Sequence, residues 1–253
     1  MAGNDKDGKK PTYAIIPAAG QGSRMGARTN KQFMELLGIP VIIRTLLKFE
    51  KSSLIDGILV VTNADEQDKL LSLCRKYSIT KLIGAVPGGE TRQDSVRNAL
   101  LYLASYIGSN TPDISSDDCQ VLIHDGARPF VSDEIIQRCV EGVEKHNACG
   151  AGVKVKDTIK IAEPGSGLII KTLPREQLWA IQTPQAFKLS LIGNLHNKAH
   201  DEKLSFTDDL SIAEYYGEKA YIVDGDYRNI KITTPIDIEI GEFLIKNGEQ
   251  DRD

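Results

Sequence analysis

The 253-residue sequence predicts an α/β fold, Rossmann-like and three-layered, with a mostly parallel sheet and a protruding β-hairpin arm. Three observations lead to it. Short apolar runs alternate with amphipathic helical segments over residues 13–147. Glycine-rich loops follow several of the apolar runs. Near residue 158 the alternation stops, and two strand-like runs flank a Pro-Gly turn. Strand–helix alternation is typical of a parallel sheet with right-handed crossovers, and the interruption is typical of a hairpin.

Composition limits the class of protein. Hydrophobic residues make up 41% and charged residues 26%, enough for an ordinary core. The net charge of −4 favours no general attraction to nucleic acid or membranes. We expect a disordered tail over 1–11, one domain over 12–247 and a C-terminal tail over 248–253. The four cysteines form no C-x-x-C pair, which indicates reduced thiols and a cytoplasmic protein.

The first strand and its loop form the clearest ligand-binding signal. Residues 13–16 are a short apolar run, typical of a buried strand. Glycines then let the backbone approach a ligand, and two cations supply charge for phosphate oxygens. The loop is neither a Walker A motif, since Gly-Lys-Ser/Thr is absent, nor a dinucleotide fingerprint, since the glycine spacing is one residue too long. The loop residues are Gly20, Gly22, Arg24, Gly26 and Lys31.

Two further loops follow predicted strands at 81–86 and 121–124. Ligands of open parallel sheets bind outside the carboxyl ends of strands, so both loops are candidates for binding. The alternative at the second loop is a simple turn. The alternative at the third is that its Asp and Arg pair only with each other. The candidate residues are Gly89, Glu90, Arg92 and Ser95 in the second loop, and Asp125, Gly126 and Arg128 in the third.

Helices are predicted over 40–51, 65–77, 92–107, 132–147, 189–203 and 207–216, with a last helix from Thr234. Further strands are predicted at 58–61, 152–155, 220–223 and 230–232, and the segment 179–185 is expected to return to the core. His196 and His200 are four apart on a predicted helix. The Glu of H-E-x-x-H is missing, so we expect a solvated helix face there and no metal site.

The hairpin arm spans 157–175, with apolar runs at 158–161 and 168–173 around Pro164-Gly165. A lone hairpin is only marginally stable in water, so it must pack on something. A second subunit is the natural candidate, although a hairpin folded back on its own domain is the alternative. We therefore expect a homodimer formed through the arm.

Several motifs together resemble one family of nucleotidyltransferases. The first loop resembles that of the pyrophosphorylase-like nucleotidyltransferases. The complete set, in this order, is similar to the 2-C-methyl-D-erythritol 4-phosphate cytidylyltransferase family of the non-mevalonate isoprenoid pathway. The similarity covers about residues 13–244. The motifs are Pro17–Gly26, Lys31–Phe33, Gly88–Arg92, His124–Pro129, Lys156–Thr158, Gln182–Gln185 and Asn229–Pro235.

The resemblance implies a cytoplasmic enzyme that joins CTP to methylerythritol phosphate and releases pyrophosphate. It implies catalytic roles for Arg24, Lys31, Arg175 and Lys231, and Mg²⁺ bound chiefly through the CTP phosphates, without a metal-binding cluster of side chains. It implies nucleotide contacts by Ala18, Ala19, Gly20, Gly89, Glu90, Arg92, Ser95 and Gly126. It implies acceptor contacts by Asp125, Arg128, Thr158, Arg175, Thr207 and Lys231.

Two alternatives stay open at this point. A ribitol-5-phosphate cytidylyltransferase would share the fold and most motifs, and would differ in its acceptor. A non-catalytic nucleotide-binding homologue would lack the cations, yet Arg24, Lys31 and Lys231 are all present. Glu90 stands where many relatives carry Asp, so its contact with the ribose is the least certain of the set.

Overall fold

The structure is a computed structural model that describes residues 10–20, 31–111 and 113–250. Within them, seven strands form a central sheet in the order β11-β7-β10-β6-β1-β4-β5. Only β10 runs antiparallel to its neighbours, β6 and β7, so the predicted mostly parallel sheet is confirmed. The strands are β1 (Thr12–Pro17), β4 (Gly57–Thr62), β5 (Leu82–Pro87), β6 (Gln120–Ile123), β7 (Ala148–Lys154), β10 (Trp179–Lys188) and β11 (Tyr221–Asp224).

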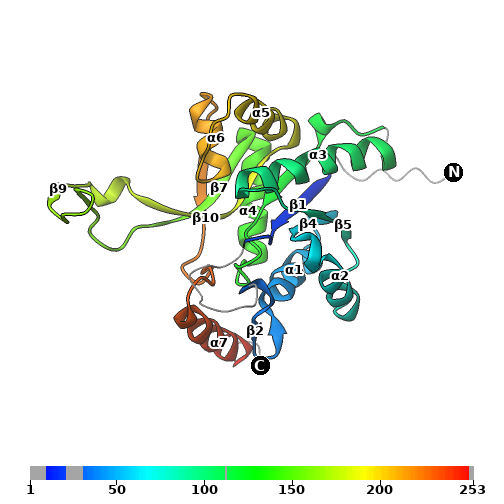
Figure 1. The fold of residues 1–253 in the computed structure, drawn as a ribbon, viewed down its shortest axis with the longest axis horizontal. Helices are drawn as coiled ribbons and strands as arrows, with labels where there is room; N and C mark the ends of the chain where they lie inside the picture. Colours follow the sequence, from blue (N-terminus) through cyan, green and yellow to red (C-terminus); the bar gives the residue numbers. More distant parts are fainter. Residues whose placement is uncertain (1–9, 21–30, 112, 251–253) are drawn as a thin grey trace.

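Helices cover both faces of the sheet, which confirms the three layers (Figure 1). On β1, Ala14 and Ile16 pack into one core, while Tyr13 and Ile15 pack into the other. This follows from the alternation of side chains along a strand. One face carries α1 (Val41–Lys51), α2 (Gln67–Lys76) and α4 (Asp133–His146), and the other carries α3 (Arg92–Asn110), α5 (Leu189–Asp201) and α6 (Asp209–Tyr215).

The parallel register brings the loops of interest to one edge of the sheet. β1 pairs with β4 and β6, and β4 pairs with β5, all in parallel. Pro17 stands opposite Val61, and Thr62 stands opposite Pro87, so these strands end together. The loops that follow β1, β4, β5 and β6 are therefore neighbours, although the ends of β1 (Pro17) and β6 (Ile123) are 106 residues apart in sequence.

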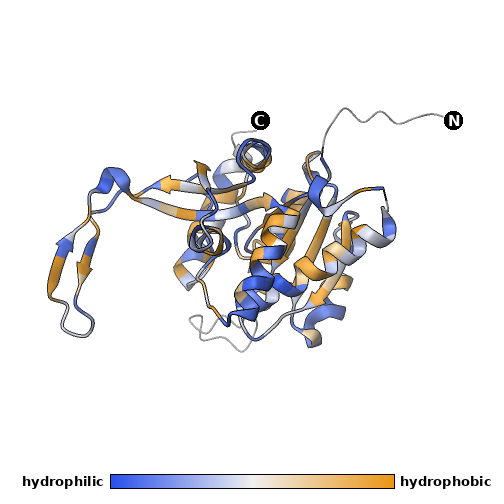
Figure 2. Ribbon diagram, turned by 90° about the horizontal axis from the view of Figure 1, so that it is seen from above, coloured by the Kyte–Doolittle hydropathy of each residue, from blue (hydrophilic) through white to orange (hydrophobic). Residues whose placement is uncertain are grey.

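The predicted arm protrudes from the body of the molecule (Figure 1). Its strands, β8 (Lys160–Ala162) and β9 (Ile169–Thr172), pair with each other in a separate two-stranded sheet. Residues 156–172 are all exposed. Figure 2 shows hydrophobic residues beside hydrophilic ones on both arm strands. A short 3₁₀ helix, η5 (Arg175–Gln177), leads back into β10.

Three local expectations differ from the structure. Residues 230–232 are not a strand: Ile232 N–H donates to the Ala127 carbonyl, and Ile230 N–H donates to the nearby Arg228 carbonyl. α6 begins at Asp209, two residues late, because Asp208 is the N-cap that accepts from Ser211 N–H. A small hairpin, β2 (Glu35–Leu36) and β3 (Ile39–Pro40), was not predicted.

The last helix, α7 (Pro235–Gln250), packs away from the main sheet. Its Ile238 and Ile245 join a small core with Leu36, Val41 and Ile232. Asp237 Oδ2 accepts from the backbone N–H groups of Thr233 and Thr234 and so secures the first turn of the helix. Among the described residues, no helix combines the length and apolar character needed to cross a membrane.

Candidate active site

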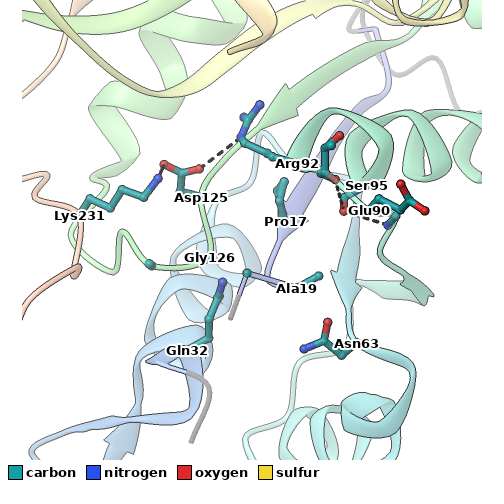
Figure 3. A pocket seen from close by; sticks show the side chains of 14 residues that line it. Pro17, Ala19, Gln32, Asn63, Glu90, Arg92, Ser95, Asp125, Gly126 and Lys231 are labelled. Atoms are coloured by element: carbon teal, nitrogen blue, oxygen red, sulfur yellow. Dashed lines mark hydrogen bonds and ion pairs between the residues drawn. The ribbon is translucent and has the colours of Figure 1, made fainter. Parts of the chain in front are cut away.

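A cavity of about 510 Å³ opens at the carboxyl ends of the parallel strands, where the loops gather (Figure 3). The β1, β4, β5 and β6 loops each contribute to it. The segment between β11 and α7 contributes Lys231. The lining residues are Pro17, Ala19, Gly20, Gln32, Asn63, Gly89, Glu90, Thr91, Arg92, Ser95, Asp125, Gly126, Ala127 and Lys231.

Close contact between these loops explains two of the glycines. A Cβ on Gly88 would lie 2.6 Å from the Ala19 side chain and 3.1 Å from Ser95 Oγ. A Cβ on Gly126 would lie 2.8 Å from Ile42 and 3.2 Å from the Pro17 carbonyl oxygen, and would also meet the Gln32 side chain. Any larger residue would push the loops apart, so the glycines set the shape of the cavity floor.

The second glycine loop opens the N-terminus of α3 toward the cavity. Thr91 caps the helix by accepting from Asp94 N–H, and Asp94 accepts from Thr91 N–H in return. Ser95 Oγ accepts from Gly89 N–H at 3.0 Å and donates to the Thr91 carbonyl at 2.8 Å. These bonds hold the loop against the first turn. The positive end of a helix dipole beside a glycine loop is a natural anion site.

The carboxylate of Asp125 contacts three cationic side chains at the cavity. Its carboxylate is 2.9 Å from Lys231 Nζ, 3.3 Å from Arg128 Nε and 3.8 Å from Arg92 Nε. Burial alone would raise the pKa of this carboxyl, but the three cations lower that pKa well below its usual range. Asp125 therefore stays ionised. The alternative that Asp125 and Arg128 pair only with each other is wrong, because Lys231 and Arg92 share the carboxylate.

Arg92 bridges Asp125 to a second buried carboxylate. Arg92 Nη2 donates to Asp209 Oδ2 at 2.7 Å, and His196 Nε2 donates to Asp209 Oδ1 at 3.1 Å. Burial alone would raise the pKa of Asp209, but Arg92 and His196 together lower it to about 2. The expected solvated position of His196 is wrong. Its side chain is fully buried, because α5 turns this residue toward the N-terminus of α6.

His124 fixes the backbone that carries Asp125. His124 Nε2 donates to the Arg128 carbonyl at 3.0 Å, and Nδ1 accepts from Thr183 Oγ1 at 3.1 Å. The same hydroxyl accepts from Asp125 N–H at 3.1 Å. Burial lowers the pKa of His124 to about 4, so the ring is neutral at pH 7 and suits this donor–acceptor pattern.

Comparison with known proteins shows which family has this sequence. The family model described as 2-C-methyl-D-erythritol 4-phosphate cytidylyltransferase matches residues 12–247. The protein of that name from Clostridium novyi is 44% identical over 236 residues, covering 92% of this chain and 96% of its own. The one from Halalkalibacterium halodurans is 43% identical, with coverages of 93% and 97%.

The chain belongs to the 2-C-methyl-D-erythritol 4-phosphate cytidylyltransferase family.

Solved structures of this cytidylyltransferase family share the fold as well. The crystal structure of 4-diphosphocytidyl-2C-methyl-D-erythritol synthase from Anaerococcus prevotii has a TM-score of 0.78 at 32% identity and covers 95% of this chain and 97% of its own. The cytidylyltransferase structure from Francisella tularensis has a TM-score of 0.74 at 30% identity, with coverages of 92% and 99%. The resemblance drawn from the motifs is thus confirmed.

The structure brings most of the residues named from the cytidylyltransferase motifs to one place. Nine of them line the cavity, and two more lie directly beside it. Ala18 is buried there, with its N–H donating to the Val61 carbonyl, and Arg128 reaches Asp125 and the Asn229 carbonyl. The nine lining residues are Ala19, Gly20, Gly89, Glu90, Arg92, Ser95, Asp125, Gly126 and Lys231.

Other predicted residues lie elsewhere. Thr158 and Arg175 stand on the exposed arm, and Arg175 Nη1 donates to the Lys156 carbonyl. Thr207 is exposed just before α6 and does not line the cavity. Lys31 begins a 3₁₀ helix, η2 (Lys31–Phe33), next to the cavity residue Gln32. Arg24 lies outside the described residues.

Sequence reasoning missed the residues that support the cavity residues from outside the lining. Asp209, His196 and Thr183 hold Arg92 and His124 in place without lining the cavity. Asn63 and Gln32, which do line it, were also missed. One signal was available: of the paired acids Asp208 and Asp209, only one can cap α6, which leaves the other for a different role.

Proposed function

We propose that this cavity binds CTP and methylerythritol phosphate together and transfers the cytidylyl group between them. The supporting observation is the opposition of two walls. Glycine loops and the α3 N-terminus form one wall. The ion pair of Asp125 and Lys231, with 2.9 Å between Oδ2 and Nζ, forms the other. Family membership suggests the substrates, because the name of the family specifies the acceptor and the cytidylyl group that is transferred.

The nucleotide belongs on the glycine-loop wall. Gly20, Gly89 and Ser95 leave room for a flat base and ribose, and the start of α3 offers positive potential. Glu90 lines the same wall, which supports a role in accepting hydrogen bonds from the ribose hydroxyls. Arg24 and Lys31, which follow the first loop in sequence, supply charge for the triphosphate. This assignment rests on the motif resemblance.

The acceptor phosphate belongs near Lys231. One of its oxygens attacks the α-phosphorus of CTP, a new P–O bond forms, and the bond to the β-phosphate oxygen breaks with its electron pair on the departing pyrophosphate. An acceptor phosphate is already ionised, so no general base is needed. The protein contributes positioning and charge stabilisation. Asp125 and Arg128 orient Lys231 through their shared ion pairs and are near enough to bind acceptor hydroxyls.

The residues of the cavity fit a metal that is held by phosphates. Mg²⁺ usually keeps few protein ligands and binds substrate phosphates. Asp125, the buried carboxylate of the cavity, already contacts Arg92, Arg128 and Lys231. Mg²⁺ would therefore be held chiefly by CTP oxygens, with Asp125 and Glu90 the nearest carboxylates. When bound, the ion would neutralise charge on the triphosphate.

The arm carries the remaining proposed residues, and we assign them to a partner. Thr158 and Arg175 are exposed at the base of the arm. Five of the six large apolar side chains of the arm are exposed and the sixth, Leu173, is only half-buried, which supports docking on a second subunit. In such a homodimer each cavity receives Thr158 and Arg175 from the other chain, and Arg175 offers a planar fork for a phosphate.

The cysteines of the chain support a location in a reducing compartment. Its four cysteines are free and buried. Such thiols are typical of the cytoplasm, where the proposed substrates would be met.

A pyrophosphate-release assay tests the chemistry. We expect release from CTP with Mg²⁺ and methylerythritol phosphate, and much less with UTP, ATP or ribitol 5-phosphate. Lys231→Met, which keeps the aliphatic stem, should lower kcat by about 10²-fold or more, as expected for loss of a preorganised charge. Lys219→Met is the matched control, because Lys219 precedes the amino end of β11 and does not line the cavity. Preference for ribitol 5-phosphate would reassign the acceptor, and full activity of Lys231→Met would remove that residue from the mechanism.

Subunit mixing tests the shared site. Arg175→Ala and Lys31→Ala should each be nearly inactive alone. After subunit exchange, half of the mixed dimers' sites receive both defects and half receive neither, so activity should rise. The control is either variant mixed with itself. Exchange without recovery would show that each chain uses its own Arg175.

A further inference from the structure

Two of the sequence motifs, Gln182–Gln185 and Asn229–Pro235, contact each other through buried amides. Lys231 of the second motif lines the cavity, but Gln182 and Asn229 do not, and the proposed reaction does not use them. Both side chains are nevertheless buried, and Asn229 fully so. A buried amide is costly unless its hydrogen bonds are made, so the bonds of these two residues indicate what they do.

The segment that carries Lys231 has no regular structure to fix it. Residues 225–234, between β11 and α7, form neither a helix nor a strand. A lysine side chain has many rotamers, so its ammonium group is well placed only if its backbone is held. Yet Lys231 Nζ lies 2.9 Å from Asp125 Oδ2 (Figure 3). On the α7 side of Lys231 the segment is held by the bond from Ile232 N–H to the Ala127 carbonyl, at 2.8 Å.

On the β11 side of Lys231, Asn229 anchors the segment to strand β10. Asn229 Nδ2 donates to Gln182 Oε1 at 3.2 Å and to the Thr183 carbonyl at 2.9 Å. Gln182 Nε2 in turn donates to the Asp226 carbonyl at 2.8 Å. The backbone on each side of Lys231 is therefore tied to a neighbouring element, and the side-chain tie is Asn229.

The anchor on β10 is a bulge that also holds the other member of the ion pair. Three residues of β10, 182–184, stand opposite Ala151 alone, and a bulge of this kind re-aims side chains. Thr183 Oγ1 accepts from Asp125 N–H at 3.1 Å, while the Thr183 carbonyl accepts from Asn229. The bulge thus holds both the backbone of Asp125 and the segment of Lys231.

Arg128 adds a third contact between the two sides. Its Nε lies 3.3 Å from Asp125 Oδ2, and its Nη1 donates to the Asn229 carbonyl at 2.9 Å. Asp125, Arg128, Asn229 and Lys231 therefore form a closed ring of contacts. A buried network whose members are joined in this way makes the geometry rigid.

We propose that Asn229, seated on the β10 bulge by Gln182 and Thr183, is the residue that positions Lys231 for the transfer reaction. The inference rests on the function proposed above and adds a positioning residue to it. Asn229 does not line the cavity and acts through Lys231. Misplacing a reacting or charge-stabilising group by about 1 Å costs up to about 10²-fold in rate. Asn229 therefore contributes to turnover as well as to stability.

A double-mutant cycle separates positioning from general support of the fold. Asn229→Ala should lower kcat by about tenfold or more, because Lys231 is then misplaced. In a chain that already carries Lys231→Met, the same substitution should change kcat by less than about twofold, since the group it positions is gone. A residue that only supports the fold would lower kcat by the same factor in both chains.

A second variant and a control keep this test independent of folding. Gln182→Met keeps the volume of the side chain and removes its amide, so it should act in the same direction as Asn229→Ala and more weakly. It carries the test if thermal denaturation shows that Asn229→Ala is unfolded at the assay temperature. Gln120→Leu is the matched control, because Gln120 is also buried but lies at the end of β6 away from the cavity. It should leave kcat unchanged in both chains.

Chemical labelling of lysines gives a readout that does not depend on activity. Acetic anhydride is applied to each variant, and the rate of acetylation of Lys231 is followed by peptide mass spectrometry. Gln182→Met and Asn229→Ala should make Lys231 react faster, because its ion pair with Asp125 is then less well held. Lys188, which pairs with Asp117 at 3.0 Å on the surface, is the internal reference and should react at an unchanged rate.

The outcomes separate this inference from the proposed function. Full activity of Asn229→Ala, or equal losses of kcat in both chains with unchanged labelling of Lys231, would show that Asn229 does not position Lys231. The proposed reaction would stand in that case. Full activity of Lys231→Met alone would remove Lys231 from the mechanism, and this inference would fail with it.

Discussion

At the scale of single residues, the site is an alternating chain of charges. Lys231, Asp125, Arg92 and Asp209 follow one another at 2.9, 3.8 and 2.7 Å. His196 ends the chain in the core. Asp125 is stabilised by Lys231, Arg128 and Arg92, and Asp209 by Arg92 and by its hydrogen bond with His196, which offsets the penalty of burying the two carboxylates. Asp209 and His196, which do not line the cavity, thus fix the position of Arg92. Arg92 in turn contacts Asp125, which holds Lys231.

Breaking this chain at Asp209 should be strongly destabilising. Asp209→Asn removes the partner of a buried ion pair, so we expect a loss of about 3 kcal/mol in the free energy of unfolding, toward the low end for such pairs because Arg92 is partly exposed. Urea denaturation measures it. In combination with Arg92→Gln the loss should be less than additive. Asp117→Asn, whose pair with Lys188 is on the surface, is the control and should change little. Strict additivity would mean that the two residues are not coupled.

His124 should make stability depend on pH in a defined window. Its pKa is about 4 in the folded chain against an ordinary value of 6.5, because burial disfavours the charged ring. Between these values the unfolded chain binds a proton that the folded chain does not, so stability is complete above pH 6.5 and falls as the pH drops toward 4. The full loss is about 3 kcal/mol.

The variant His124→Asn checks this by urea denaturation at several pH values. It should lose a constant amount of stability at pH 8, from its altered hydrogen bonds, and should show a flatter decline between pH 6.5 and 4. An unchanged slope would assign the decline to other groups.

At the scale of elements, the nucleotide wall depends on one tight connection between β5 and α3. The capping box of Thr91 and Asp94 fixes the first turn, and Gly89 passes directly over it. A Cβ on Gly89 would collide with the Asp94 side chain and lie 3.1 Å from its carbonyl carbon. The loop and the helix N-terminus therefore move as one unit.

Gly89→Ala should accordingly impair nucleotide binding. The added methyl group must displace either the loop or the cap, so KM for CTP should rise about tenfold, while KM for the acceptor changes less. Initial-rate kinetics with each substrate varied would show the split. Gly193→Ala is the matched control, because a Cβ there meets nothing within 4 Å and lies within α5. It should leave kinetics unchanged and favour the helix slightly. Equal effects on both substrates would argue against a role confined to the nucleotide wall.

At the scale of the whole molecule, the body and the arm differ in how they bury their hydrophobic side chains. The body buries two cores, one on each face of its sheet. The arm adds exposed hydrophobic surface and no core within the described residues (Figure 2). Such a segment is unfavourable in an isolated chain and becomes favourable on association.

Activity per milligram should therefore depend on enzyme concentration. Dilution below the dimer dissociation constant should reduce specific activity, because each cavity loses the partner's Arg175. A chain in which a short Gly-Ser turn replaces 160–172 should keep the far-ultraviolet circular dichroism of a folded α/β body, sediment as a monomer and stay inactive at all concentrations. Constant specific activity of the unmodified chain across the measured transition from dimer to monomer would contradict this prediction.

The sequence by itself determined the architecture and the ligand-binding loops. Local patterns are enough for these, since a strand alternates with period two, a helix with period 3.6, and glycine marks the tight loops. The parallel order then requires the loops after β1, β5 and β6 to meet at one edge. The cavity residues Gly20, Gly89 and Asp125 were identified on this basis. The motifs also identified the family.

Tertiary structure alone decided which charges meet. Arg92 and Asp209 are 117 residues apart, and Asp125 and Lys231 are 106 apart, so no local pattern couples them. His196 looked like a surface residue because helical spacing does not show which neighbouring helix covers it. Local periodicity determines where the helices and strands form. Which charges pair, and which helix faces are buried, depends on how elements distant in sequence pack together.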